Sequence, residues 1–264
     1  MVNWLSSLPA GVLVAGWLGL AVLVAALGRL GIRALVPVEE QDQVPQIASP
    51  LMPALGAAFA IFAALTLASE AGYLRSSEVL VSDEATAASR LAWAATSPGV
   101  DSEPIHSALR TYLETTRAQE WADEDAASGN DVATARAIAE LEQVVRAEAA
   151  RPELGTPASS ELLTSLDAVT SGRRARVAAA SREIPTLYVG TLVVSGLALI
   201  VNAGALTFRS RWRTSLLVVG LAMVVGMSLA LLFSISAPWR GPLVVSGHPI
   251  DEIIRDLRAG FFAD

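Results

Sequence analysis

Long apolar segments separate the polar parts of this chain. No Asp, Glu, Lys, Arg or His occurs in residues 8–27, 49–69, 184–208 and 214–239. Each segment is long enough to cross a hydrocarbon core of about 30 Å as a helix of about 20 residues. Helices are expected because a helical span satisfies its backbone hydrogen bonds inside the lipid. The pattern predicts four transmembrane helices, at about 9–28, 50–69, 185–208 and 215–237.

The ends of these spans carry further signals. Residues 1–8 contain no Arg or Lys, whereas a cleaved signal peptide has a positive segment there, so the first span is expected to be retained. Pro50, Pro53 and Pro185 are expected in first helical turns, where the missing amide costs little. Residues 1–69 would then hold the first two spans with their connecting loop, and residues 184–238 the other two.

Residues 70–183 have a different pattern. Apolar residues recur there at helical spacing, with almost no β-branched alternation. We expect four helices, over 76–96, from Glu103-Pro104, after the turn at 129–131, and from Thr156-Pro157. Their apolar stripes are Ile105, Leu109, Tyr112, Leu113 and Thr116, then Ile138, Leu141 and Val145, then Leu162, Leu166, Val169 and Val177. The pattern predicts an all-α chain with a helical bundle inserted between the second and third spans.

The tail, residues 239–264, predicts one amphipathic helix. Gly247-His248-Pro249 is typical of a helix start with proline at the first helical position. One face carries Ile250, Ile253, Ile254, Leu257 and Phe261. This face could lie in the membrane interface, on another subunit or on the bundle, and packing within the protein is expected most.

Composition excludes several kinds of protein. Apolar residues make up 53% of the 264, charged residues only 17%, and the chain has no cysteine. A soluble protein, a disulfide-stapled domain and a thiolate metal site are therefore excluded. All 19 basic residues are arginine, so a lysine nucleophile and a P-loop lysine are also excluded. No metal site, cofactor or catalytic residue is expected.

The charge distribution bears on partners and orientation. Residues 70–183 contain 11 Arg and 19 acidic residues, a net charge of −8, which disfavours nucleic acid and leaves a protein partner at the acidic bundle possible. Arginines near the membrane do not decide the orientation, because five lie in the two short loops and six lie on the opposite side. A multi-pass protein of the plasma (inner) membrane is expected, with a slight preference for a cytoplasmic bundle.

Few residues point to chemistry inside the spans. Asn202 is the only amide there, and one interhelical hydrogen bond is expected for it. Phe59 and Phe62, three residues apart in the second span, are candidates for an aromatic constriction in a pore formed by several copies. Contact with lipid or with a neighbouring helix is the simpler interpretation of both phenylalanines.

Charged residues of the bundle offer a second candidate site. Four arginines precede the third span: Arg173, Arg174, Arg176 and Arg182. One interpretation is an anion vestibule near the membrane, and the simpler one is pairing with lipid phosphates or with the many nearby acids. The carboxylates of Glu84 and Glu120 are expected on solvated helix faces.

The order of these features resembles that of the bestrophin-like domain family of bacterial membrane proteins, over about residues 50–260. The matching marks are Glu84-Ala85, Leu91, Leu109, Tyr112, Glu120-Trp121, Arg173-Arg174, Ile184-Pro185 and the run from Pro238 through Trp239 and Gly241 to Leu243. The resemblance implies kinship with bestrophins, which are pentameric anion channels with four membrane helices per subunit. Trp239 departs from the Phe-like residue expected after that proline.

Two functions from different classes therefore stay open. The first is a homo-oligomeric, bestrophin-like anion channel, because four uncharged spans cannot line a wet pore within one subunit. The second is a non-transporting interaction subunit that docks a partner through the acidic run at 123–125. A ligand sensor is disfavoured because the short loop at 209–213 and the tail leave no room for an output domain, and an enzyme is not expected.

Overall fold

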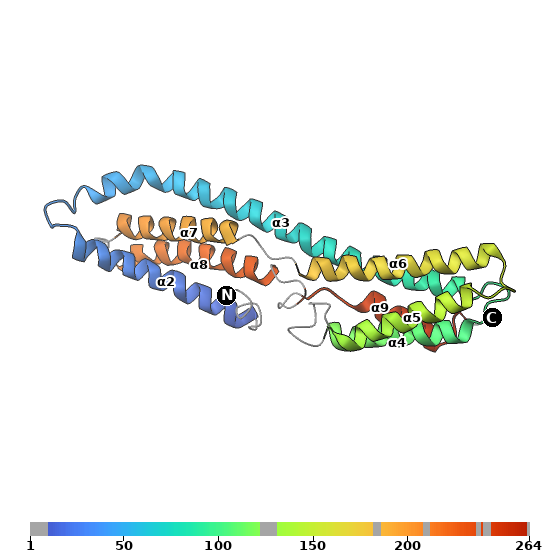
Figure 1. Ribbon diagram of the computed structural model, residues 1–264. Helices are drawn as coiled ribbons and strands as arrows, with labels where there is room; N and C mark the ends of the chain where they lie inside the picture. Colours follow the sequence, from blue (N-terminus) through green and yellow to red (C-terminus); the bar gives the residue numbers. More distant parts are fainter. Residues whose placement is uncertain are drawn as a thin grey trace. The chain divides into compact units, whose positions relative to one another are not determined.

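The computed structural model describes residues 10–121, 131–181, 186–207, 212–235, 239 and 244–262, and within these ranges the chain is all-helical (Figure 1). Eight helices occur there, and no strand: α2 (Ala10–Leu35), α3 (Val44–Ala94), α4 (Ser102–Glu120), α5 (Val132–Ala149), α6 (Thr156–Ala180), α7 (Thr186–Thr207), α8 (Trp212–Ile235) and α9 (His248–Arg258). The prediction of an all-α chain is confirmed.

The described residues form two compact units. The membrane unit consists of α2, α3 up to Gly72, α7 and α8. The helical unit consists of α3 from Tyr73, α4, α5, α6, Trp239 and the segment from Val244 that contains α9.

Four helices are long and apolar enough to cross a membrane, which confirms the number of spans. They are Val14–Leu35, a part of Val44–Ala94, Leu187–Thr207 and Leu216–Ile235. Within the membrane unit α2, α7 and α8 pack against one another. Their core is filled by side chains that include Leu192, Ile200, Ala222 and Leu232. The amide of Asn202 donates to the carbonyl of Ala48 over 3.0 Å, which confirms the interhelical hydrogen bond.

The long helix α3 corrects two expectations. It is continuous over 51 residues, so no break separates the second span from the first helix of the bundle. Residues 70–75 contain no proline and bury Glu70 and Tyr73, which favours an unbroken helix there. Pro50 and Pro53 lie inside α3 rather than in its first turn, because the helix begins at Val44. Pro185 lies outside the described residues.

The helical unit has one apolar core, to which the predicted stripes contribute. All five predicted positions on α4, from Ile105 to Thr116, are fully buried. On α5 and α6 most of the predicted stripe is buried too, with Ile138 and Val177 only half-buried. The side chain of Asp131 caps α5 by accepting from the amide of Thr134 over 2.7 Å.

The tail helix α9 packs within the helical unit, against α4, as expected most. It begins after Gly247 with proline in its first turn. Ile250 and Ile254 are buried in the core, but Phe262 takes the buried place expected for Phe261. Two hydrogen bonds, of 2.6 and 3.0 Å, join Arg117 on α4 to Asp251 on α9.

Candidate functional site

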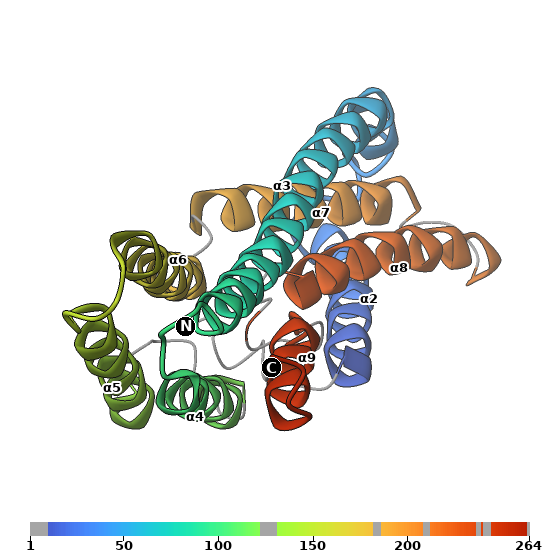
Figure 2. The ribbon, with the colours of Figure 1, turned by 90° about the vertical axis from the view of Figure 1, so that its right-hand side faces the viewer.

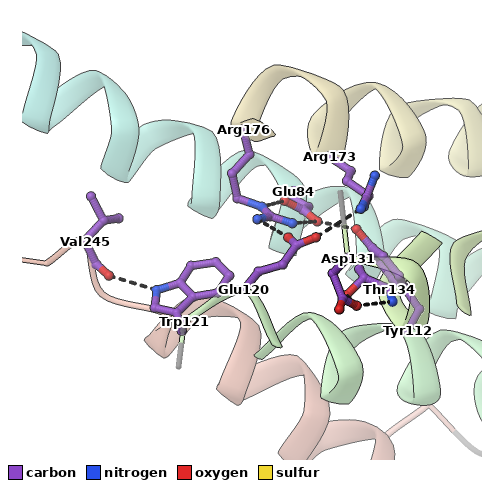
Figure 3. A network of polar contacts seen from close by, with 9 residues as sticks. All are labelled: Glu84, Tyr112, Glu120, Trp121, Asp131, Thr134, Arg173, Arg176 and Val245. Carbon is purple, nitrogen blue, oxygen red and sulfur yellow. Dashed lines mark hydrogen bonds and ion pairs between the residues drawn. The ribbon is translucent and has the colours of Figure 1, made fainter. Parts of the chain in front are cut away.

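A buried network of charged side chains lies inside the helical unit (Figure 3). Three helices supply its members. Glu84 comes from α3, Tyr112 and Glu120 come from α4, and Arg173 and Arg176 come from α6. These residues are spread over more than ninety positions of the chain, and only the packing of the helices brings them together.

Arg176 is the centre of the network. Its Nε donates to Oε2 of Glu84 over 2.5 Å, and its Nη1 lies 2.5 Å from Oε2 of Glu120. The side chain of Arg176 is 3% exposed and the two glutamate side chains are 0% exposed. One guanidinium thus bridges two carboxylates out of contact with water, where an isolated charge would be very costly.

Further hydrogen bonds complete the network. Arg173 Nη2 donates to Oε1 of Glu120 over 3.0 Å, so Glu120 also binds two arginines. The hydroxyl of Tyr112 donates to Oε1 of Glu84. Two arginines face two glutamates, so the network has no net charge when the tyrosine is protonated. Because each charge has a partner of opposite sign, no uncompensated charge is buried in the network.

Burial and charge fix the protonation states. Burial, then the negative charge of Glu84, raises the pKa of the Tyr112 hydroxyl well above its ordinary value. Burial alone would lower the pKa of Arg176, but the charge and hydrogen bond of Glu84, with the charge of Glu120, raise it above the ordinary value. Tyr112 therefore stays a hydrogen-bond donor, and Arg176 stays a cation, throughout the neutral range.

A glycine lets the helices approach closely at this point. A Cβ atom on Gly172 of α6 would lie 3.2 Å from the Cα of Glu84 on α3. That distance leaves no room for a larger side chain without moving one of the two helices. The contact brings the α6 backbone close enough for Arg176, one turn further along, to reach Glu84.

Trp121 connects the network to the tail. The guanidinium carbon of Arg176 lies 5.1 Å from the centre of the Trp121 ring, and that of Arg117 lies 5.2 Å from it. The indole Nε1 donates to the carbonyl of Val245 over 3.0 Å. Trp239 packs edge-on against the same ring, with 6.1 Å between ring centres. The segment before α9 is thereby held against the end of α4.

The geometry favours a structural role for this network. Both carboxylates are paired with arginine or tyrosine side chains, and a buried carboxylate held in ion pairs is not available as a general base. Within the described residues no group of three or more His, Asp or Glu is placed to hold a metal ion. The expectation that Glu84 and Glu120 lie on solvated faces is wrong. Both carboxylates are buried, because arginines from α6 neutralise their charge inside the unit.

The predicted site residues fall into separate places. Of the vestibule candidates, Arg173 and Arg176 are paired with carboxylates as described above, Arg174 is exposed, and Arg182 lies outside the described residues. The simpler expectation of pairing with nearby acids is therefore confirmed for two of them. Pro238, Gly241 and residues 123–125 also lie outside the described residues.

The two pore candidates do not share an environment. Phe59 is 6% exposed and packs in the core of the membrane unit, where a Cβ on Gly196 would lie 3.2 Å from its Cε2. Phe62 is 39% exposed. Phe59 therefore belongs to the core of the membrane unit, whereas Phe62 lies at its surface.

Sequence reasoning missed the pairing of Glu84 with Arg176. A signal was present: Glu84 recurs at helical spacing with Val81, Ala88 and Leu91, which are all fully buried. An acidic residue on an apolar helix face indicates a buried partner of opposite charge. The periodicity could not identify which arginine that partner is.

The fold defines a helical membrane protein with four candidate spans and a separate unit held by buried ion pairs. The Bestrophin-like domain family matches residues 19–250, and the chain belongs to this family. No curated protein matches the sequence at a significant level.

Solved structures agree with the family. A point variant of a bacterial bestrophin homologue from Klebsiella pneumoniae is similar with a TM-score of 0.71 and 14% identity, over 95% of this chain and 99% of that chain. A second variant of a bestrophin homologue from the same organism gives a TM-score of 0.70 and 13% identity, over 93% and 99%. At such low identity the similarity establishes the fold, which is that of the bestrophin homologues along nearly their whole length.

Proposed function

We propose that this protein is the subunit of a homo-oligomeric, bestrophin-like anion channel of the plasma membrane. The observation that carries the proposal is the bestrophin fold over 93–95% of the chain. Bestrophins are anion channels, and the match leaves no large part of either chain unaccounted for. In this proposal the helical unit is a domain inserted between the second and third spans.

The packing of the membrane unit supports a pathway between copies. Phe59, Leu192, Ile200, Ala222 and Leu232 fill its interior, and each is at most 6% exposed. A filled interior leaves no channel for water within one copy. A permeation path in this fold would therefore run along outer helix surfaces that several copies bring together around an axis.

The outer surface of α3 supplies candidates for the lining of that path. Ile61, Phe62 and Leu65 are 57%, 39% and 65% exposed. Rings of such side chains around an axis would form a hydrophobic constriction that resists wetting. Phe62 is retained as the aromatic member of this constriction. Phe59 is not, because it belongs to the core.

The test is flux through purified protein in vesicles, together with its native mass in detergent. The channel proposal expects a closed ring and an anion flux that Phe62→Ala raises by widening the constriction. Phe59→Ala is the matched control, because it should lower the yield of folded protein without raising flux per ring. Rings that carry no flux, in the presence of folded protein, would favour the alternative of a non-transporting interaction subunit. A strictly monomeric protein would remove the channel proposal.

A further inference from the structure

Four of the exposed charges of the helical unit that have no ion-pair partner among the described residues lie at matching positions on two helices. They are Asp83 and Arg90 on α3, and Asp167 and Arg174 on α6. Other charges on the surface of the same unit are paired, such as Arg117 with Asp251 and Arg258 with Glu114. Exposed charges such as Arg136 and Glu161 also have no such partner, so the four residues are distinguished by their spacing on the two helices.

The two sets have the same spacing and the same order along the chain. Asp83 precedes Arg90 by seven residues on α3, and Asp167 precedes Arg174 by seven residues on α6. Seven residues are two helical turns, so each pair lies on one face of its helix, about 10 Å apart. Two such helices side by side and antiparallel would bring each aspartate to an arginine.

The relative level of α3 and α6 is fixed within one chain. Gly172 lies against the Cα of Glu84, and the hydroxyl of Tyr73 bonds to the carbonyl of Ala179. Residue numbers increase along α3 in the direction in which they decrease along α6. The two helices are therefore antiparallel. Counting from Glu84 and Gly172 puts Asp83 level with Arg174, and Arg90 level with Asp167, to within one residue.

Rotation about an axis leaves the level of every residue along that axis unchanged. In a ring whose axis runs along these helices, α3 of one copy and α6 of the next keep the level that they have within one chain. Asp83 would then stand opposite Arg174 of the next copy, and Arg90 opposite Asp167. These four residues are exposed and so are available for such contacts.

We infer that α3 of one copy packs against α5 and α6 of the next, with Asp83 bound to Arg174 and Arg90 bound to Asp167. The occupant of this surface is a second copy of the chain. The inference rests on the proposed function, since it requires a ring, and it identifies the surface that closes the ring.

The receiving surface is a shallow groove with matching chemistry. A cavity of about 280 Å³ lies between α5 and α6 and is lined by Glu142, Arg146, Leu163, Leu166, Asp167, Thr170 and Arg174. Apolar contact is matched at one end, where Trp93, 52% exposed, stands level with Leu163, 40% exposed. Along α3 the order is Trp93, Arg90 and Asp83. At the same levels α6 presents Leu163, Asp167 and Arg174.

The two surfaces lie on different helices. In Figure 2, α5 and α6 lie to the left of the end of α3 that belongs to the helical unit, and α9 lies to its right. The patches on α3 and on α5–α6 are different, so contact between copies is head-to-tail. Head-to-tail contact closes into a ring when the rotation fits.

Disulfide trapping tests this interface, because the chain has no cysteine. The double variants Arg90→Cys with Asp167→Cys, and Asp83→Cys with Arg174→Cys, are oxidised in membranes and run on a denaturing gel without reductant. A disulfide forms only between Cβ atoms about 4 Å apart. Both matched pairs should give a ladder of cross-linked species up to the closed ring, and reductant should abolish it.

The control is Arg90→Cys with Arg174→Cys, which are about 10 Å apart in level and should stay at the monomer position. A ring by native mass without a ladder from either matched pair overturns the interface and leaves the channel proposal standing. A ladder from the control as strong as from the matched pairs overturns it as well. A strictly monomeric wild-type protein removes both the proposed function and this interface.

Charge reversal gives a second readout. Asp83→Arg and Arg174→Asp should each lower the fraction of protein in rings by placing like charges opposite one another. Together in one chain they should restore it, because the pair is re-formed with reversed signs. A double variant that assembles no better than the single variants would contradict the pairing.

Discussion

The guanidinium Nε of Arg176 lies 2.5 Å from Oε2 of Glu84, in the interior of the helical unit. The two residues are 92 positions apart in the chain, on α6 and α3. This pairing, together with the ion pair between Arg176 and Glu120, links α6 to α3 and α4. The proposed interface between copies depends on the relative level of α3 and α6.

Removing the cation from this network should destabilise the helical unit strongly. Arg176→Gln leaves Glu84 and Glu120 buried without their main partner. Breaking a buried pair in this way costs about 3–5 kcal/mol. Thermal unfolding followed by helical circular dichroism in detergent measures the loss. Arg136→Gln on exposed α5 is the control and should change stability by less than about 0.5 kcal/mol.

Gly172 should not tolerate a methyl group. Gly172→Ala would place a Cβ 3.2 Å from the Cα of Glu84, and the helices must separate to relieve the overlap. Overpacking of this kind costs about 1–3 kcal/mol. Gly72→Ala on α3 is the matched control, since nothing lies within 4 Å of its added Cβ. Equal unfolding temperatures for the two variants would refute the close contact.

Tyr112 should make stability depend on pH in the alkaline range. Its pKa is raised in the folded state, so its contribution is complete below the ordinary value of 10.0 and is lost as the pH rises above it. The free energy of unfolding should fall there by up to about 1.4 kcal/mol per pH unit. Denaturant unfolding of Tyr112→Phe should lack this component. A wild-type curve parallel to that of the variant above pH 10.0 would contradict the buried hydroxyl.

The two phenylalanines of the second span should differ in their effect on stability. Phe59→Ala leaves a cavity in the membrane-unit core and should cost about 3–5 kcal/mol. Phe62→Ala removes a partly exposed ring and should cost much less. Unfolding in detergent compares them. Equal losses would mean that neither ring is part of the core, or that both are.

The sequence alone determined the helical class, the four apolar spans and the inward faces of the bundle helices. These features follow from local periodicity, which a single segment carries by itself. The faces of α4 and α9 were predicted nearly residue by residue, because an amphipathic stripe must turn toward a core wherever that core lies.

Tertiary structure decided which helix meets which, and therefore which charges pair. Glu84 and Arg176 carry no local sign of each other, and Phe59 and Phe62 have the same local pattern although only one is in the core. The continuity of α3 past Gly72 was likewise set by packing, since Glu70 and Tyr73 are buried on either side of that glycine. Burial of an ion pair depends on residues that are distant in sequence and close in space, and no periodicity of one segment contains that information.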